Sequence, residues 1–130
     1  MYNIAIDGPA GAGKSSIAKA LSKKLGFVYI DTGAMYRAVA LFFLENGIKD
    51  SSDNEIDNLL DKLDINIKYT DGEQRVFLNN VDVSDKLRQE EIGKLASRFS
   101  ALKSVREKLV ALQRKLAKKE NVIMDGRDIG

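Results

Sequence analysis

Residues 8–15 combine two glycines five positions apart with a lysine and a serine after the second one. They read Gly8-Pro9-Ala10-Gly11-Ala12-Gly13-Lys14-Ser15, which fits the spacing of a phosphate-binding loop. The preceding residues 3–7 are short, apolar and rich in isoleucine, as in a buried strand. A strand, a glycine loop and a helix start in this order point several backbone N–H groups at one anion. The pattern therefore predicts a phosphate site at the start of an α/β domain.

Two side chains of this loop have predicted roles. Lys14 can reach the outer phosphates of a nucleotide, and the Ser15 hydroxyl can hold Mg²⁺. The following helix is predicted from Ile17, Leu21 and Leu25, which recur at helical spacing before Gly26.

Composition excludes several other kinds of chemistry. The 130 residues include no histidine and no cysteine, so imidazole acid–base catalysis, thiol nucleophiles and their metal sites are excluded. A content of 44% hydrophobic and 31% charged residues is typical of one soluble globular domain. The absence of cysteine and of any leader-like segment before the first strand favours a reducing cytoplasm. No apolar run is long enough for a membrane, and a net charge of +2 is too small to indicate nucleic acid.

A second strand and two helices are expected next. Residues 27–30 form a buried strand, and a helix follows from Asp31 to about Asn46, stopped by Gly47. Ser52 and Glu55 form a capping-box pattern before a helix whose apolar residues are Ile56, Leu59, Leu60 and Leu63.

The pattern then changes to alternation. Apolar and polar residues alternate around residues 65–69, 76–78 and 81–83, with turn signals at Asp71-Gly72 and Asn79-Asn80. This predicts a small antiparallel sheet, distinct from the buried parallel one. Two helices are expected after it, over about 85–100 and 104–119. The second carries a capping-box pattern in Ser104 and Glu107.

Residues 121–125 form a third buried strand, which runs into Asp125-Gly126-Arg127-Asp128. Because ligands of parallel α/β sheets lie outside the carboxyl ends of the strands, the phosphate loop, the Asp31–Arg37 segment and this segment are expected to line one crevice. Arginine suits such a site since its planar fork bonds phosphate oxygens in pairs. Each residue also has a plainer interpretation: Asp31 or Thr32 as a helix cap, Arg37 as a surface charge.

These motifs together resemble the bacterial cytidylate kinase family. The segments that carry the resemblance span the chain in family order and are Ile6–Ser15, Asp31-Thr32-Gly33-Ala34-Met35-Tyr36-Arg37, Val81-Asp82-Val83-Ser84 with Leu87-Arg88, Ser104-Val105-Arg106-Glu107, and Met124–Gly130. The resemblance implies a P-loop kinase fold of the nucleoside-monophosphate class, with a parallel sheet and flanking helices. It also implies transfer of the ATP γ-phosphoryl group to CMP or dCMP, with Mg²⁺.

The resemblance also implies site residues, by their positions within the matching motifs. The predicted ATP-binding residues are Gly8, Pro9, Ala10, Gly11, Ala12, Gly13, Lys14, Ser15 and Ser16. Arg37 and Arg127 are expected to hold the acceptor phosphate, and Asp125 to support Mg²⁺ through water. The resemblance implies further acceptor contacts from Thr32, Ser97, Arg106 and Asp128. Arg106 stands in the first turn of a helix, where a cation is electrostatically unfavourable, which supports a functional role.

The family resemblance also predicts the organisation of the chain. Residues 1–63 and 120–130 are expected to form a P-loop core, 64–103 a monophosphate-binding insert, and 104–119 a helix returning to the core. Family members continue past Gly130, so the central sheet is expected to be incomplete, the first strand to border an open edge, and these residues alone to be poorly active. The complete enzyme is expected to be a monomer, whereas these residues alone can associate through that edge.

Three alternatives remain at this point. Another P-loop kinase, such as a shikimate-type kinase, would phosphorylate a hydroxyl group. A GTPase-like switch would require Asp-x-x-Gly after the third strand, which Asp125-Gly126-Arg127-Asp128 lacks. The third alternative is a nucleotide-binding module without activity.

Overall fold

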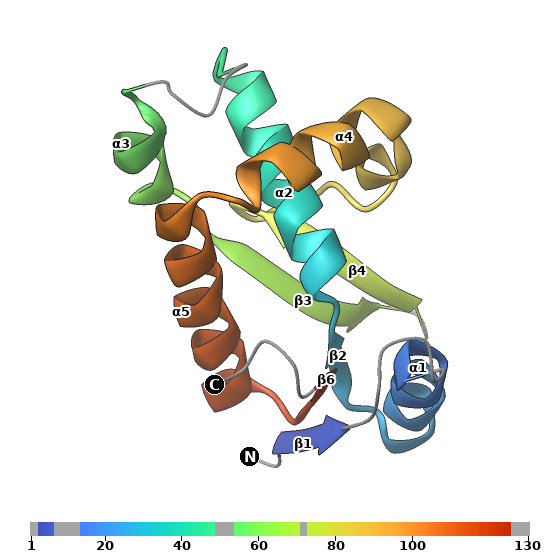
Figure 1. Cartoon of the computed structure of the whole chain (residues 1–130). Helices are drawn as coiled ribbons and strands as arrows, with labels where there is room; N and C mark the ends of the chain where they lie inside the picture. The colour runs from blue at the N-terminus through green and yellow to red at the C-terminus, as the bar shows by residue number, and fades with distance from the viewer. Residues whose placement is uncertain (1–2, 7–13, 49–53, 71–72, 126–130) are drawn as a thin grey trace.

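The computed structural model describes residues 3–6, 14–48, 54–70 and 73–125. Its elements in chain order are β1 (Asn3–Ile6), α1 (Lys14–Leu25), β2 (Val28–Ile30), α2 (Thr32–Glu45), α3 (Ile56–Leu60), β3 (Ile65–Thr70), β4 (Glu73–Leu78), β5 (Val81–Asp82), the 3₁₀ turn η1 (Lys86–Arg88), α4 (Glu90–Phe99), α5 (Lys103–Lys119) and β6 (Val122–Asp125). The predicted α/β class, a parallel sheet with flanking helices, is confirmed (Figure 1).

The parallel sheet has the order β1-β6-β2, so the strand latest in the chain lies between the two earliest. Ile6 of β1 pairs with Asp125 of β6, and Ile30 of β2 pairs with Met124. The three strands therefore end at the same edge of the sheet, as the sequence predicts. Within the described residues β1 pairs on one side only, which leaves it at the border of the sheet.

The second sheet is antiparallel, in the order β3-β4-β5. Its β4–β5 turn is formed by Asn79 and Asn80, whose φ angles of 47° and 71° both lie in the left-handed region. Asn79 also fastens the turn to the start of β3. Its N–H donates to the Asp64 carbonyl at 2.8 Å, and the Asp64 N–H donates to Asn79 Oδ1 at 2.7 Å. The predicted small antiparallel sheet is confirmed.

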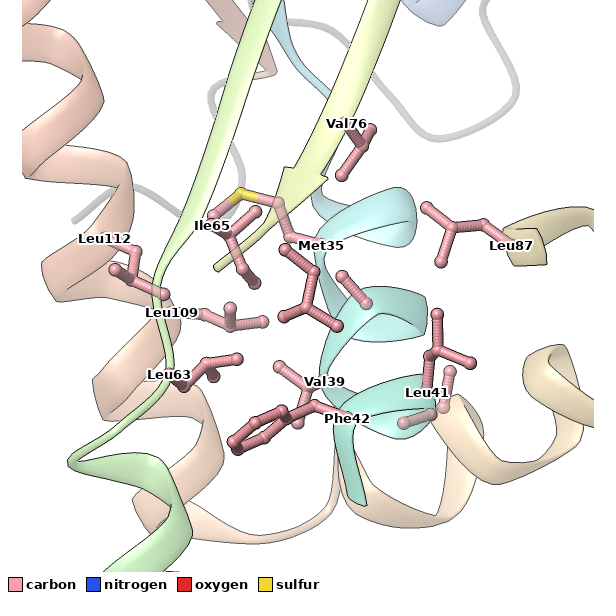
Figure 2. Packing of buried hydrophobic residues seen from close by; sticks show 14 of the residues in the cluster. Met35, Val39, Leu41, Phe42, Leu63, Ile65, Val76, Leu87, Leu109 and Leu112 are labelled. Atoms are coloured by element: carbon pink, nitrogen blue, oxygen red, sulfur yellow. The ribbon is translucent and has the colours of Figure 1, made fainter. Parts of the chain in front are cut away.

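Helix α2 is the centre of the main hydrophobic core. Apolar side chains all around it are buried, which is the pattern of a helix enclosed by other elements. In Figure 2, Met35 and Val39 face Ile65 of β3 and Leu109 of α5. On another side of α2, the ring of Phe43 meets Phe99 of α4 edge-on, with centroids 4.7 Å apart. The core thus joins α2 to both the antiparallel sheet and the later helices.

Helix α1 forms on the expected residues, but only part of its predicted apolar face is buried. Ala18 and Ser22 are completely buried, and Ala18 forms a smaller cluster with Tyr29 of β2 and Ile123 of β6, against which Leu21 also packs. Ile17 and Leu25, two of the three residues whose spacing predicts the helix, remain 55% and 45% exposed. The small residues allow close approach of the helix to the sheet, which apolar periodicity alone does not reveal.

One predicted helix is divided in two, and one predicted capping box does not form. The helix expected over 85–100 is divided into η1 and α4 by Gln89, which is extended with ψ at 136°. Helix α5 begins at Lys103 rather than after Ser104, and its N-cap, Leu102, makes no side-chain capping bond. Glu107 instead pairs with Lys103 at 3.6 Å.

Helix α3 also departs from its expected capping box. It begins at Ile56, so Glu55 occupies the N-cap position instead of the third helical position and makes no capping bond there. Its carboxylate accepts a 3.4 Å hydrogen bond from the Asn58 amide. Ser52, the other half of the pattern, lies outside the described residues. Leu63 lies past the end of the helix, buried in the core.

Candidate functional site

A cavity of about 650 Å³ lies at the carboxyl end of β2. Its walls come from α1, from the junction of β2 with α2, from β4 and from the segment around η1. The residues lining it are Lys19, Ser22, Lys23, Tyr29, Asp31, Gly33, Ala34, Arg37, Glu73, Gln74, Val76, Ser84, Leu87 and Arg88. Four of these are cations and two are carboxylates, so the cavity suits an anionic ligand.

Asp31 caps the helix that enters this cavity. It has an extended backbone, and its Oδ1 accepts a hydrogen bond from the Ala34 N–H at 3.1 Å. The helix-cap interpretation of Asp31 is therefore confirmed, and Thr32 is the first helical residue, half-buried. The cap holds the N-terminus of α2 at the cavity wall, where its dipole favours a negative group.

Arg37 follows one turn later and reaches toward α4. A Cβ placed on Gly93 would lie 3.7 Å from Arg37 Nη2 and 3.9 Å from Nε, so the guanidinium lies against the glycine backbone. In the part of the chain that the structure describes, no carboxylate forms an ion pair with Arg37. The guanidinium is exposed and lines the cavity, available to an anion.

A hydrogen-bonded network includes the lining residues Val76 and Ser84. The Ser84 hydroxyl accepts from the Val76 N–H and donates to Asp82 Oδ1, both at 2.8 Å. Arg75 Nε donates to Asp82 Oδ2 at 2.9 Å, and Arg75 Nη1 lies 3.5 Å from Glu73 Oε1. The Arg75 bond, with those from Ser84, lowers the pKa of Asp82 from 3.8 to about 2. The network stays ionised near neutral pH and holds the β5 segment against β4.

Ser97 and Arg106 lie away from the cavity lining. The exposed Ser97 hydroxyl donates to the Gly93 carbonyl at 3.3 Å, so Ser97 shares the α4 face that Arg37 touches. Arg106 lies on α5 beside a separate cavity of about 310 Å³, with Glu107 and Arg114. The structure therefore brings Ser97 near Arg37 but leaves Arg106 in another cavity. Both acceptor roles stay predictions.

The structure describes the residues on either side of the predicted phosphate loop, but not most of the loop itself. Lys14, Ser15 and Ser16 occupy the first turn of α1, and Asp125 ends β6 opposite Ile6. Ile6 and Asp125 therefore lie together at the edge where the parallel strands end. The remaining predicted residues lie outside the described ranges: Gly8, Pro9, Ala10, Gly11, Ala12, Gly13, Arg127 and Asp128.

Several lining residues were not singled out from the sequence. Lys19 and Lys23 stand four residues apart on α1, a spacing that marks one helical face, but an exposed lysine pair is an ordinary surface feature. Gln74 gives no sequence signal at all, since any polar residue satisfies the alternation of its strand. Arg88 lies within a segment of the family resemblance, without a role assigned there.

The described residues contain neither a membrane-spanning helix nor a metal-binding cluster. None of the helices there combines the length and apolarity needed to cross a bilayer. Within the same ranges, no three His, Cys, Asp or Glu side chains gather as a metal-binding group.

Comparison with known proteins decides the family. The family model described as cytidylate kinase matches residues 4–130. The chain belongs to the cytidylate kinase family. The cytidylate kinase of Caldicellulosiruptor bescii is 56% identical over 128 residues, which cover 98% of this chain and 57% of that protein. Those of Carboxydothermus hydrogenoformans and Lactobacillus gasseri are 53% and 52% identical, with 57% and 56% of their lengths covered. The chain thus spans a little over half the length of the cytidylate kinases it matches.

Proposed function

We propose that these residues belong to a nucleoside monophosphate kinase that transfers the γ-phosphoryl group of ATP to CMP or dCMP. The observation that carries the proposal is the family match over residues 4–130, together with a cation-lined cavity at the expected strand end. Residues 64–103 would form the monophosphate-binding insert and residues 1–63 with 120–130 the core. We place the enzyme in the cytoplasm because it has no cysteine to oxidise, and we expect a monomer that binds no nucleic acid.

The reaction needs positioning and positive charge more than a proton acceptor. An oxygen of the CMP phosphate attacks the γ-phosphorus, and the bond from that phosphorus to the bridging oxygen of ADP breaks. The attacking group is already largely ionised near pH 7, because the second pKa of a phosphate monoester is about 6. A chain without histidine can therefore perform this chemistry.

The proposed roles divide between the two nucleotides. Lys14 binds the outer phosphates of ATP, held there by residues 8–16. Arg37 and Arg127 hold the acceptor phosphate against repulsion from ATP. Thr32, Ser97, Arg106 and Asp128 contact the rest of the acceptor. Support for Arg37 comes from its position on the cavity wall, without an ion-pair partner among the described residues.

The proposed donors fit magnesium. Ser15 offers a hydroxyl and Asp125 a carboxylate, and oxygen ligands of this kind are those Mg²⁺ prefers. Ser15 lies in the first turn of α1, and Asp125 is the last residue of β6. When bound, the ion would neutralise phosphate charge.

The test is the substitution Arg37→Ala in a family-length chain that carries these residues. We expect the KM for CMP to rise tenfold or more (about that order for a lost charge-assisted bond pair), with the KM for ATP changed by less than about twofold. The matched control is Arg98→Ala, because Arg98 is an exposed arginine of α4 outside the cavity lining. Equal losses for both nucleotides would contradict the assigned role.

A substrate panel tests the function itself. A CMP kinase forms CDP and ADP, whereas a shikimate-type kinase would phosphorylate a hydroxyl acceptor and leave CMP unchanged. Absence of CDP from the family-length chain would refute the proposed function.

A further inference from the structure

The side-chain amide of Gln74 bonds both backbone polar groups of Tyr29. The Tyr29 N–H donates to Gln74 Oε1 at 2.9 Å, and Gln74 Nε2 donates to the Tyr29 carbonyl at 2.7 Å. Both distances are ordinary for N–H···O bonds. The opposite amide orientation would place like groups against each other, so this geometry fixes which atom is oxygen.

These two bonds join the two sheets. Tyr29 is the middle residue of β2 in the parallel sheet, and Gln74 lies in β4 of the antiparallel one. Among the described strands, β2 pairs only with β6, so no described strand forms a ladder with its other edge. The carboxamide offers one donor and one acceptor, as a residue of a neighbouring strand would. Gln74 thus takes the place of one residue of a further strand.

The junction lies at the wall of the cation-lined cavity. Tyr29 and Gln74 both line it, as do Asp31 and Arg37. Asp31, two residues after Tyr29, caps the helix that carries Arg37. A shift of β4 along or away from β2 would therefore move one wall of the cavity relative to the guanidinium.

We propose that Gln74 is a positioning residue, whose amide docks β4 on the edge of β2 and sets the distance between that cavity wall and Arg37. The part of this that concerns nucleotide binding rests on the function proposed above. Gln74 acts through the docked strands rather than on the reacting atoms, so its loss should affect the acceptor and spare ATP.

Two variants separate the hydrogen bonds from the bulk of the side chain. Gln74→Met keeps the length but has neither donor nor acceptor of comparable strength. Gln74→Glu keeps the shape, but an ionised carboxylate has no donor for the Tyr29 carbonyl and repels it. A protonated carboxyl group has one donor and one acceptor again, like the amide. The pKa of a glutamate facing that carbonyl should lie above its usual value of about 4.3. The Glu variant should therefore regain the docking as the pH falls.

The first measurement is hydrogen exchange of the Tyr29 amide, followed by NMR in the 130-residue chain at pH 7 and at about pH 5. Protection factors are corrected for intrinsic exchange at each pH. We expect Gln74→Met to lower Tyr29 protection about tenfold at both pH values, roughly the effect of one hydrogen bond. Gln74→Glu should lose as much at pH 7 and regain most of it at the lower pH. Gln89→Met, at an exposed glutamine outside the cavity, is the matched control and should leave Tyr29 unchanged.

The second measurement is steady-state kinetics of a family-length chain with Gln74→Met. We expect the KM for CMP to rise several-fold, with the kcat and the KM for ATP within about twofold of wild type. Unchanged Tyr29 protection in the Met variant would overturn the docking. Lost protection with an unchanged KM for CMP would overturn the positioning. A wild-type chain that forms no CDP would instead refute the proposed function, and the exchange result would still decide the docking.

Discussion

At the scale of single residues, the contact between Arg37 and Gly93 sets where the guanidinium can lie. Gly93 stands in the middle of α4, where glycine is normally unfavourable by about 1 kcal/mol relative to alanine. The Arg37 guanidinium occupies the space beside the glycine backbone. A small residue on one helix thus leaves room for a functional side chain on another.

Substitution of Gly93 should separate helix stability from arginine placement. A Cβ would meet Nη2 at 3.7 Å, an ordinary contact, so Gly93→Ala should keep Arg37 in place. We expect this variant to gain up to about 1 kcal/mol of unfolding free energy in urea titration. Gly93→Leu should displace the guanidinium and raise the KM for CMP about tenfold in a family-length chain. A Leu variant with the KM of the Ala variant would show that the contact is unimportant.

At the scale of elements, the β4–β5 turn depends on two residues in the left-handed region. Both central positions of this turn require positive φ, as in the tight hairpin turns that prefer Asn-Gly. Asn79 combines this backbone with its two bonds to Asp64, which a glycine could not fully replace. Asn80 has no such bond among the described residues, so its backbone conformation is its main requirement.

The variant Asn80→Gly should therefore stabilise the hairpin. We expect a gain of about 0.5 kcal/mol, because glycine adopts positive φ without steric cost. Asn80→Ala should cost about 1 kcal/mol, since its Cβ meets the backbone in that conformation. Urea unfolding followed by circular dichroism measures both. Equal stabilities of the Gly and Ala variants would exclude backbone strain as the cause.

Local sequence patterns predicted many of the helices and strands. Asp31 and Gly47 bound α2 as expected, because a cap and a left-handed glycine act within a few residues. The capping box predicted at Ser104 does not form, because α5 starts earlier, at Lys103. Glu107 instead forms an ion pair with Lys103. The break at Gln89, whose backbone is extended, has no signal in the local sequence pattern.

The candidate site also has a part that the sequence predicts and a part that it does not. Arg37 was identified because its motif follows a predicted strand, so its place at the sheet edge could be inferred. Gln74 was missed because it meets Tyr29 across 45 residues of chain. The alternation of apolar and polar residues in β4 indicates only which face of the strand the Gln74 side chain is on, not what it contacts. Such tertiary contacts are the part of the site that the sequence alone does not reveal.

At the scale of the whole molecule, one hydrophobic core crosses the boundary between the proposed core and insert. The main cluster includes Val39 of α2, Ile67 of β3, Phe99 of α4 and Leu112 of α5. Elements that share a core in this way usually unfold together. We therefore expect the segments around α2 to form one cooperative unit.

Truncation at Phe43 tests this cooperativity. The side chain is fully buried and meets Phe99 edge-on, so Phe43→Ala should cost about 3–5 kcal/mol. That is a large share of the stability of a domain of this size. Amide exchange should show β4 and α5 losing protection by similar amounts. Phe43→Leu, which fills more of the space, should cost clearly less. Loss confined to α4 would contradict a shared unit.

The central place of β6 has a consequence for how the protein is made. On the ribosome, the first two strands emerge long before Val122–Asp125, yet neither pairs with the other. The hairpin and its helices involve nearby residues and can assemble early, whereas the parallel ladder must wait for a distant insertion. Nascent chains arrested before Val122 should therefore hold a folded hairpin region beside two unjoined strands.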